Sequence, residues 1–285
     1  MSASPTSILL VNCPDQPGIV AKLSGLVFEH GGNIVDSDHH TDFAAQRFLG
    51  RIEWMLDGFR LDREATRAAI GSIMEPYGGQ WELHHSDQRP RLSIWCSKQD
   101  HCLLDLLWRH KAGELDAEIP LIVSNHPELG AIAKDFGLPF HHLATTKATK
   151  SAVEAEALRL LEAYRNDFVV LAKYMQIVSD AFLETFPRVI NIHHSFLPAF
   201  SGAMPYHQAH ARGVKVIGAT AHYVTPELDA GPIIEQDIIR VSHRDTVEDL
   251  VRKGRDLERM ALSRAVRLHL QHRVLTYNNR TVVFE

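Results

Sequence analysis

The hydrophobic and polar positions of the first 86 residues change between the two-residue period of a strand and the longer period of a helix. Apolar residues at helical spacing predict two helices, at Ile19–Glu29 and Leu61–Glu75. Short apolar runs around them predict four strands, at Ser7–Cys13, Ile34–His40, Gln46–Met55 and Gln80–His85. The order strand–helix–strand–strand–helix–strand is that of a ferredoxin-like domain, which we expect over residues 1–86.

A short polar segment that ends in proline, residues 87–90, predicts a linker. Beyond it, strand patterns alternate with helical patterns. The expected strands are Arg91–Cys96, Leu121–Ser124, Phe140–Leu143, Phe168–Ala172 and Val189–His193. The expected helices are Cys102–Lys111, Leu129–Phe136, Lys150–Tyr164 and Asp180–Phe186. This alternation predicts a Rossmann-like α/β domain over residues 91–285, with a mainly parallel sheet covered by helices on both faces.

The C-terminal part of the chain departs from this alternation. Two strands, Ile217–Val224 and Pro232–Val241, are joined by a short connection and are expected to be antiparallel. A long amphipathic helix follows, and Asp245 with Glu248 predicts a capping box at its start. The apolar stripe of this helix is expected to cover the sheet.

Composition narrows the class of protein. The formal net charge of −5 argues against a chain whose main role is to bind nucleic-acid phosphates. No apolar run approaches the roughly 20 residues of a membrane-spanning helix, and Met1–Thr6 lacks the basic start of a signal peptide. Cys13, Cys96 and Cys102 are odd in number and scattered, which favours reduced thiols over a disulfide framework. We expect a cytoplasmic protein without a membrane or nucleic-acid partner.

Candidate chemistry gathers where one predicted strand ends. Asn191 and His193 alternate with apolar residues, so both side chains project to one side of the strand. Ligands bind beyond the carboxyl ends of the strands in sheets of this kind. Asp229, in a second loop, can complete a constellation suited to attack on a carbonyl carbon. No serine or cysteine nucleophile is evident, so these residues point to acyl-group chemistry on a small molecule.

Several segments carry a resemblance to known families. The turn Cys13–Val20 resembles the entry turn of an ACT domain, a regulatory module that often binds amino acids, over residues 7–86. Residues 91–270 resemble the formyltransferase family that uses 10-formyltetrahydrofolate, and the segments concerned are Leu171–Val178, Asn191–Pro198, Gly218–Val224 and Asp229–Pro232. The pairing of the two is similar to the formyltetrahydrofolate deformylase family. The resemblance implies hydrolysis of 10-formyltetrahydrofolate to tetrahydrofolate and formate, which supplies formate for purine synthesis and balances one-carbon folate pools.

The resemblance assigns catalysis to Asn191, His193 and Asp229, with no cofactor and no covalent intermediate. The Asn191 carboxamide can donate to the developing oxyanion, and His193 can donate to the same oxygen or carry a proton near neutral pH. Asp229 can hold the attacking water and accept its proton, or fix the charge state of the imidazole. Both His193 and Asp229 are candidates for the base, with Asp229 slightly favoured.

Four more residues are candidate substrate contacts. The resemblance places pterin contacts near Met175 and Ile177, for which ordinary core packing is the alternative. His222 is either a partner of the catalytic residues or a packed strand histidine, and Asn125 ends a strand on the expected side. The histidine doublets at 39–40, 84–85 and 141–142 do not suggest a metal site, because adjacent strand residues point to opposite faces.

The N-terminal domain is a candidate effector domain. Asp15, Gly18, Asn33 and Ile34 are expected to border an amino-acid site, and the resemblance suggests glycine or methionine as the effector. A purely structural dimerisation module is the alternative. Because such domains commonly pair across their sheets, we expect a homodimer or a homotetramer.

Water, rather than an amine, is the expected acceptor of the formyl group. A transferase that acts on a phosphorylated amine is expected to carry a glycine-rich phosphate loop after the first strand of this domain, whereas Cys96–His101 contains no glycine. A formyltransferase and a non-enzymatic folate-binding sensor are the alternatives. The chain departs from the deformylase pattern at Ser201 and at Met204, which replaces an expected basic residue and removes a possible contact with the folate's glutamate tail.

Overall fold

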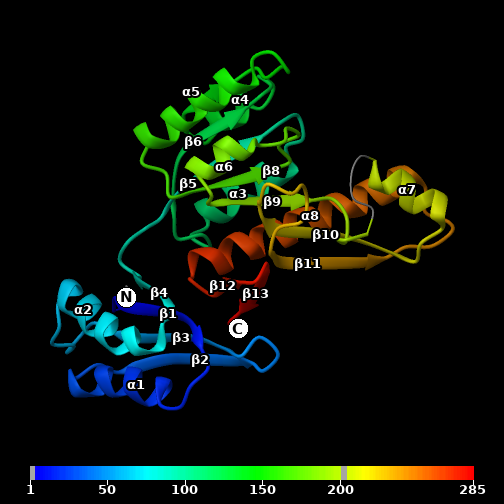
Figure 1. The fold of residues 1–285 in the computed structure, drawn as a ribbon. Helices are drawn as coiled ribbons and strands as arrows, with labels where there is room; N and C mark the ends of the chain where they lie inside the picture. The colour runs from blue at the N-terminus through cyan, green and yellow to red at the C-terminus, as the bar shows by residue number, and fades with distance from the viewer. Residues whose placement is uncertain (1–3, 200–203) are drawn as a thin grey trace. The chain divides into compact units, whose positions relative to one another are not determined.

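The computed structural model describes residues 4–199 and 204–285, and it divides into two compact units (Figure 1). The first unit contains the chain up to Arg89 together with Gln271–Glu285, and the second is Pro90–Leu270. The chain passes from one unit to the other at the end of the polar segment that predicts a linker.

The first unit is an antiparallel sheet with two helices on one face. Its strands pair in the order β2-β3-β1-β4, and the core between sheet and helices includes Leu23, Trp54 and Ile70. The predicted ferredoxin-like order is confirmed. The elements are β1 (Thr6–Pro14), α1 (Ile19–Glu29), β2 (Ile34–Asp42), β3 (Arg47–Met55), α2 (Arg63–Met74), the short helix η1 (Glu75–Tyr77) and β4 (Gln80–His85).

A C-terminal hairpin also belongs to the first unit. It consists of β12 (Val274–Tyr277) and β13 (Arg280–Val283), which pair with each other as a sheet of two strands. The apolar side chains that join the hairpin to the sheet are Leu10, Leu49, Leu275 and Phe284. This face is opposite the one covered by the helices, because Leu10 alternates along β1 with residues of the helix-side core. The expectation that residues 271–285 belong to the second domain is therefore wrong.

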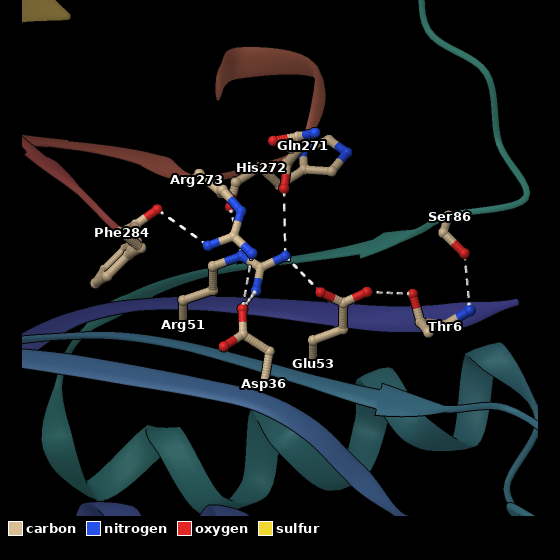
Figure 2. A network of polar contacts seen from close by, with 9 residues as sticks. All are labelled: Thr6, Asp36, Arg51, Glu53, Ser86, Gln271, His272, Arg273 and Phe284. Carbon is tan, nitrogen blue, oxygen red and sulfur yellow. Dashed lines mark hydrogen bonds and ion pairs between the residues drawn. The ribbon is translucent and has the colours of Figure 1, made fainter. Parts of the chain in front are cut away.

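A buried arginine ties the hairpin to the sheet (Figure 2). Arg51 of β3 is 2% exposed and forms ion pairs with Asp36 and Glu53, both at 2.6 Å. It also donates to the carbonyl oxygens of His272 at 3.1 Å and Gln271 at 3.3 Å, just before β12. A guanidinium removed from water depends on these partners, since an unpaired buried charge is strongly destabilising.

The second unit is a seven-stranded sheet covered by helices on both faces. Its strand order is β11-β10-β9-β8-β5-β6-β7, in which β9 to β7 are parallel and β10 and β11 are added antiparallel at one edge. The elements are β5 (Arg91–Cys96), α3 (His101–Lys111), β6 (Glu118–Ser124), α4 (Gly130–Asp135), β7 (Phe140–His142), α5 (Lys150–Ala163), β8 (Phe168–Ala172), α6 (Asp180–Thr185), β9 (Val189–His193), α7 (Pro205–Arg212), β10 (Val216–Tyr223), β11 (Ile233–Arg240) and α8 (Val247–Leu270).

Alternation along β8 shows which helices cover which face of this sheet. Val169 packs in the same core as residues of α5 and α6. Phe168, its neighbour, points the other way and lies against His269 of α8, with ring centroids 4.6 Å apart. The predicted mainly parallel α/β fold and the antiparallel last pair of strands are confirmed. None of the helices in residues 4–199 and 204–285 is long and apolar enough to cross a membrane.

The start of α8 differs from the sequence prediction. Thr246 caps the helix: its hydroxyl accepts from the Asp249 N–H at 3.2 Å, and the Asp249 carboxylate accepts from the Thr246 N–H at 3.1 Å. This capping box lies one residue later than the predicted pair Asp245 and Glu248, so that prediction is wrong. Asp245 with Glu248 and Thr246 with Asp249 have the same capping-box spacing, so the sequence does not show which pair caps the helix. The backbone geometry decides between them.

Replacing Arg51 with methionine is expected to lower the free energy of unfolding by up to roughly 3–5 kcal/mol, because two carboxylates lose their buried partner. Urea denaturation measures this loss. Arg63→Met is the control, since the Arg63–Asp87 pair is exposed and is expected to contribute less than about 1 kcal/mol. Equal losses in the two variants would contradict the proposed anchoring role of Arg51.

Candidate active site

The edge of the sheet where β9 ends carries polar side chains from two neighbouring strands. Asn191 and His193 occupy alternate positions of β9 and project to one face. β10 pairs antiparallel with β9 and places His222 directly opposite Asn191. Asn191 Nδ2 lies 3.2 Å from His222 Nε2, so the amide donates to the imidazole. His222 Nδ1 lies 2.9 Å from the Tyr223 carbonyl oxygen and therefore carries the proton of the neutral ring.

The turn between β10 and β11 brings Asp229 to the same edge. Asp229 has a φ of +56°, in the left-handed region that aspartate tolerates better than most residues. Gly231 is required in this turn, because a Cβ there would lie 1.8 Å from the Tyr223 carbonyl oxygen. Asp229 Oδ1 lies 3.2 Å from His193 Nδ1 and 3.9 Å from His222 Nε2. The three residues predicted to be catalytic are thus brought together, with His222 among them.

Burial and charge define the protonation of the site. The hydrogen bond from His193 holds the pKa of Asp229 below its usual value, although burial opposes this shift. The carboxylate is therefore ionised at neutral pH and accepts the His193 Nδ1 proton. His193 Nε2 is buried and has no hydrogen-bond partner among the described residues. Burial lowers the pKa of His222, so that ring is neutral at pH 7.

The predicted folate contacts lie at the same end of the strands. Met175 and Ile177 are 60% and 61% exposed, so the alternative of core packing is excluded for both. Asn125 is buried, and its Oδ1 atom accepts from Ser97 Oγ at 2.6 Å. Ser97 Oγ in turn accepts from the Met175 N–H at 2.9 Å. Asn125 is therefore linked to the Met175 backbone through Ser97, and its side-chain carbonyl oxygen already accepts a hydrogen bond within the protein.

The departures from the deformylase pattern lie just before α7. Met204 is exposed and has a φ of +58° directly before the first residue of the helix. Ser201 lies outside the described residues.

Sequence reasoning missed a buried ionic cluster beside this site. Glu258 of α8 accepts from His101 and Tyr206 and pairs with Lys173. Possible ligand atoms of His101, Cys102 and Glu258 lie within 4.8 Å of one another, a spacing that a metal ion can bridge. Because the Lys173 ammonium already neutralises the carboxylate, we assign the group as an ion-pair cluster rather than a metal site.

The four predicted effector residues of the first unit do not meet at one place. Asp15 and Gly18 follow β1 and lie beside the start of β3, whereas Asn33 and Ile34 lie beside its end. The nine residues of β3 span about 26 Å at roughly 3.3 Å per residue. β1 and β2 are both antiparallel to β3, so the end of one and the start of the other are at opposite ends of the sheet. Within one chain, therefore, the four residues do not border a single site.

Comparison with known families defines the class of protein. A formyl transferase model matches residues 91–266, and an ACT domain model matches residues 7–73. The chain thus joins an ACT domain to a formyl transferase domain.

Individual relatives narrow this class. The formyltetrahydrofolate deformylase of Synechocystis sp. is 61% identical over 279 residues, which cover 98% of this chain and 98% of the relative. That of Bacillus subtilis is 49% identical and covers 97% of this chain and 93% of its own length. The crystal structure of a formyltetrahydrofolate deformylase from Pseudomonas syringae pv. tomato matches with a TM-score of 0.97 at 46% identity, over 100% of this chain and 96% of that one.

The chain belongs to the formyltetrahydrofolate deformylase family, a family of hydrolases in one-carbon folate metabolism. The predicted family, the ACT domain and the predicted enzyme class are confirmed.

His194, beside the catalytic edge, is expected to make stability depend on pH. Burial, with the Lys173 and His193 charges, lowers the pKa of His194 from 6.5 to about 4. Below pH 6.5 the unfolded chain takes up this proton and the folded chain does not, so the free energy of unfolding falls as the pH falls. Between pH 7 and pH 5 this residue alone is expected to account for a loss of about 2 kcal/mol.

Urea denaturation at pH 7 and pH 5 measures this dependence. His194→Gln should remove its part of the loss, and His243→Gln, at an exposed position, should leave the loss unchanged. A His194→Gln protein that still loses as much stability as the wild type would contradict the assignment.

Proposed function

We propose that Asn191, His193 and Asp229 carry out the hydrolysis of 10-formyltetrahydrofolate to tetrahydrofolate and formate, with water as the nucleophile and no covalent intermediate. The observation that carries the proposal is the 3.2 Å contact between Asp229 Oδ1 and His193 Nδ1, beside a buried His193 Nε2 without a partner in the described residues. Such an arrangement orients the imidazole and leaves one nitrogen for proton transfer.

The reaction begins when water adds to the formyl carbon and the formyl oxygen becomes an oxyanion. One N–H of Asn191 is held by His222, which leaves a second N–H for the oxyanion. His193 Nε2 takes the proton that the water loses and delivers it to N10 of the folate. The bond between carbon and N10 then breaks, and the electron pair of that bond stays with the protonated nitrogen. The collapse gives formic acid, which loses its proton to the solvent, so one water is consumed and formate, a proton and tetrahydrofolate leave.

His193 is the better candidate for the base. A general base works best when its pKa lies near the working pH, and the lowered pKa of Asp229 makes that carboxylate a poor proton acceptor at pH 7. His193 Nε2, in contrast, has no hydrogen-bond partner among the described residues and is the ring nitrogen left to take a proton. His193 therefore replaces Asp229, which the sequence alone slightly favours, as the base, and Asp229 holds the ring and the attacking water.

Water as the acceptor is supported by the segment that follows β5. Ser97 in this segment is buried, and its hydroxyl is engaged by Asn125 and Met175. A phosphate loop instead needs glycines and free backbone N–H groups aimed at the ligand. The segment therefore offers few groups that could bind the phosphate of a phosphorylated amine. Wild-type turnover that strictly requires an added amine would contradict the proposal.

Asp229→Asn is expected to lower kcat for formate release by about 10³-fold or more, because the amide no longer holds the His193 Nδ1 proton in place. The assay uses purified protein, 10-formyltetrahydrofolate and water alone. Asp237→Asn is a matched control, since Asp237 lies on β11 and pairs with Arg264 instead of a catalytic residue. An Asp229→Asn protein that retains a tenth of the wild-type kcat would contradict the assigned role.

We also propose that the ACT domain binds an amino acid, glycine or methionine, where two copies of the chain meet. The residue pairs Asp15 with Gly18 and Asn33 with Ile34 lie at opposite ends of one sheet, so one site can be bordered by both pairs only if different copies contribute them. A homodimer or a homotetramer provides such a junction.

Effector binding is expected to change the rate of formate release in the wild type and not in Asp15→Ala or Asn33→Ala. The measured quantity is the ratio of rates with and without glycine or methionine. If the site is shared, mixing the two variants under conditions that exchange subunits should restore part of the response. Retention of the full response by either variant alone would contradict this assignment.

A cytoplasmic location and catalysis without a cofactor complete the proposal. Cys13, Cys96 and Cys102 are free and buried, as expected in a reducing compartment. The steps described above need only water and side chains of this chain.

A further inference from the structure

Four elements of the second unit meet at one buried carboxylate. Glu258, in the middle of α8, is 1% exposed. It accepts from His101 Nε2 at the start of α3 at 2.6 Å and from the Tyr206 hydroxyl of α7 at 2.8 Å. Lys173, directly after β8, places its Nζ atom 3.4 Å from the same carboxylate. Burial alone would raise the pKa of Glu258, but these three partners lower it to about 2.

Stability alone does not explain this cluster. The cost of removing two charges from water offsets most of their attraction, so apolar residues of similar volume would often serve as well. Lys173 also has a φ of +61°, a left-handed conformation that is costly for a lysine. Backbone strain of this kind concentrates at functional sites.

Tyr206 connects the cluster to the proposed catalytic histidine. The ring centroids of Tyr206 and His194 lie 6.2 Å apart. His194 stacks on His193, with centroids 5.0 Å apart and ring planes inclined at 24°. The Tyr206 ring also lies directly on α8, since a Cβ on Gly254 would be 1.9 Å from the Tyr206 hydroxyl oxygen. The helix and Glu258 together therefore fix the position of the ring.

We propose that Tyr206, held by Glu258, is a positioning residue for the hydrolysis. It keeps His194 stacked on His193 and thereby holds the His193 imidazole in line with Asp229. The proposal rests on the catalytic role proposed for His193 and assigns which neighbouring rings support that imidazole.

The charges around His194 agree with a supporting role. Lys173 and His193 disfavour a proton on His194, while Glu258 and Asp229 favour one. Burial is the largest cause that disfavours the proton, and the resulting low pKa of His194 leaves the ring uncharged at pH 7. A neutral ring can lie against His193 through the cycle in which His193 gains and loses a proton.

Tyr206→Phe tests the proposal, because it removes only the hydroxyl that Glu258 holds. We expect kcat for formate release to fall about tenfold, with KM for 10-formyltetrahydrofolate within about twofold of the wild type, because small misplacements of a catalytic group act mainly on kcat. Tyr164→Phe is the matched control, since the Tyr164 hydroxyl also bonds a histidine, His141, at 3.2 Å. Its kcat is expected to equal that of the wild type. A wild-type kcat in Tyr206→Phe, or an equal fall in the control, would overturn the proposal.

A double-mutant cycle separates positioning from a general structural effect. If Tyr206 acts through His194, then His194→Ala should lower kcat by a similar factor, and the variant with both changes should lose little more than either alone. Losses that multiply in the double variant would overturn the proposal. If instead His193→Ala retained the wild-type kcat, the proposed catalytic site itself would fail, which is a different outcome.

Gly254→Ala is expected to disrupt the same contact between Tyr206 and Glu258 from the side of α8. Its methyl group should push the Tyr206 hydroxyl away from Glu258 and lower kcat at least as far as Tyr206→Phe does. Gly25→Ala is the control, because a Cβ on this helical glycine of α1 meets nothing within 4 Å. A Gly254→Ala protein with the wild-type kcat would also overturn the proposal.

Discussion

The hydrogen bond between Asp229 and His193 is the contact on which the rest of the site depends. It requires the turn after β10, which leaves the sheet beside the start of β9 at Ile190, to fold back until Asp229 reaches His193. It also requires a residue without a Cβ at Gly231, where the turn passes the Tyr223 carbonyl oxygen. The pairing of β9 with β10 also places His222 opposite Asn191, where its ring accepts a hydrogen bond from the Asn191 amide. The strand register thus orients Asn191 and His193 beside β10, and the turn adds the carboxylate of Asp229.

Buried charge is used for positioning in both units. In the first unit, Arg51 and Arg273 both bond Asp36, and each also donates to a backbone carbonyl of the C-terminal segment (Figure 2). In the second unit, Glu258 joins residues from four elements beside the catalytic edge. Each group loses hydration that its partners must replace, so the geometry of the partners is strongly specified. Apolar packing of the same volume would tolerate small shifts that these clusters do not.

Strong local patterns made much of the fold and part of the site predictable. The apolar runs of the parallel strands predict their positions, and two-residue alternation places Asn191 and His193 on one face. The rule that ligands bind beyond the carboxyl ends of parallel strands predicts a site at this pair, whereas the part of Asp229 follows from the resemblance and not from topology. These inferences depend on neighbours in sequence or on rules of connection, which a single sequence contains.

Other features depend on contacts between distant residues, and sequence reasoning missed them. The hairpin is two short strands whose partners, Leu10 and Leu49, lie far away in the chain. The two pairs of effector residues lie at opposite ends of the sheet, and this separation follows from the strand register, which the sequence does not contain. Glu258 did leave a signal, since it is a charged residue on the buried stripe of α8, between Gly254 and Ala261. A charge in such a position requires a buried partner, but the sequence does not identify Lys173 or Tyr206 as that partner.

The most direct test of the central claim is a single turnover of 10-formyltetrahydrofolate in water labelled with heavy oxygen, without any amine, by the wild type and His193→Ala. Wild-type protein is expected to release formate carrying one oxygen from the solvent, and His193→Ala is expected to release almost none in the same time. Formate without solvent oxygen, or release by His193→Ala at the wild-type rate, would contradict water attack assisted by His193.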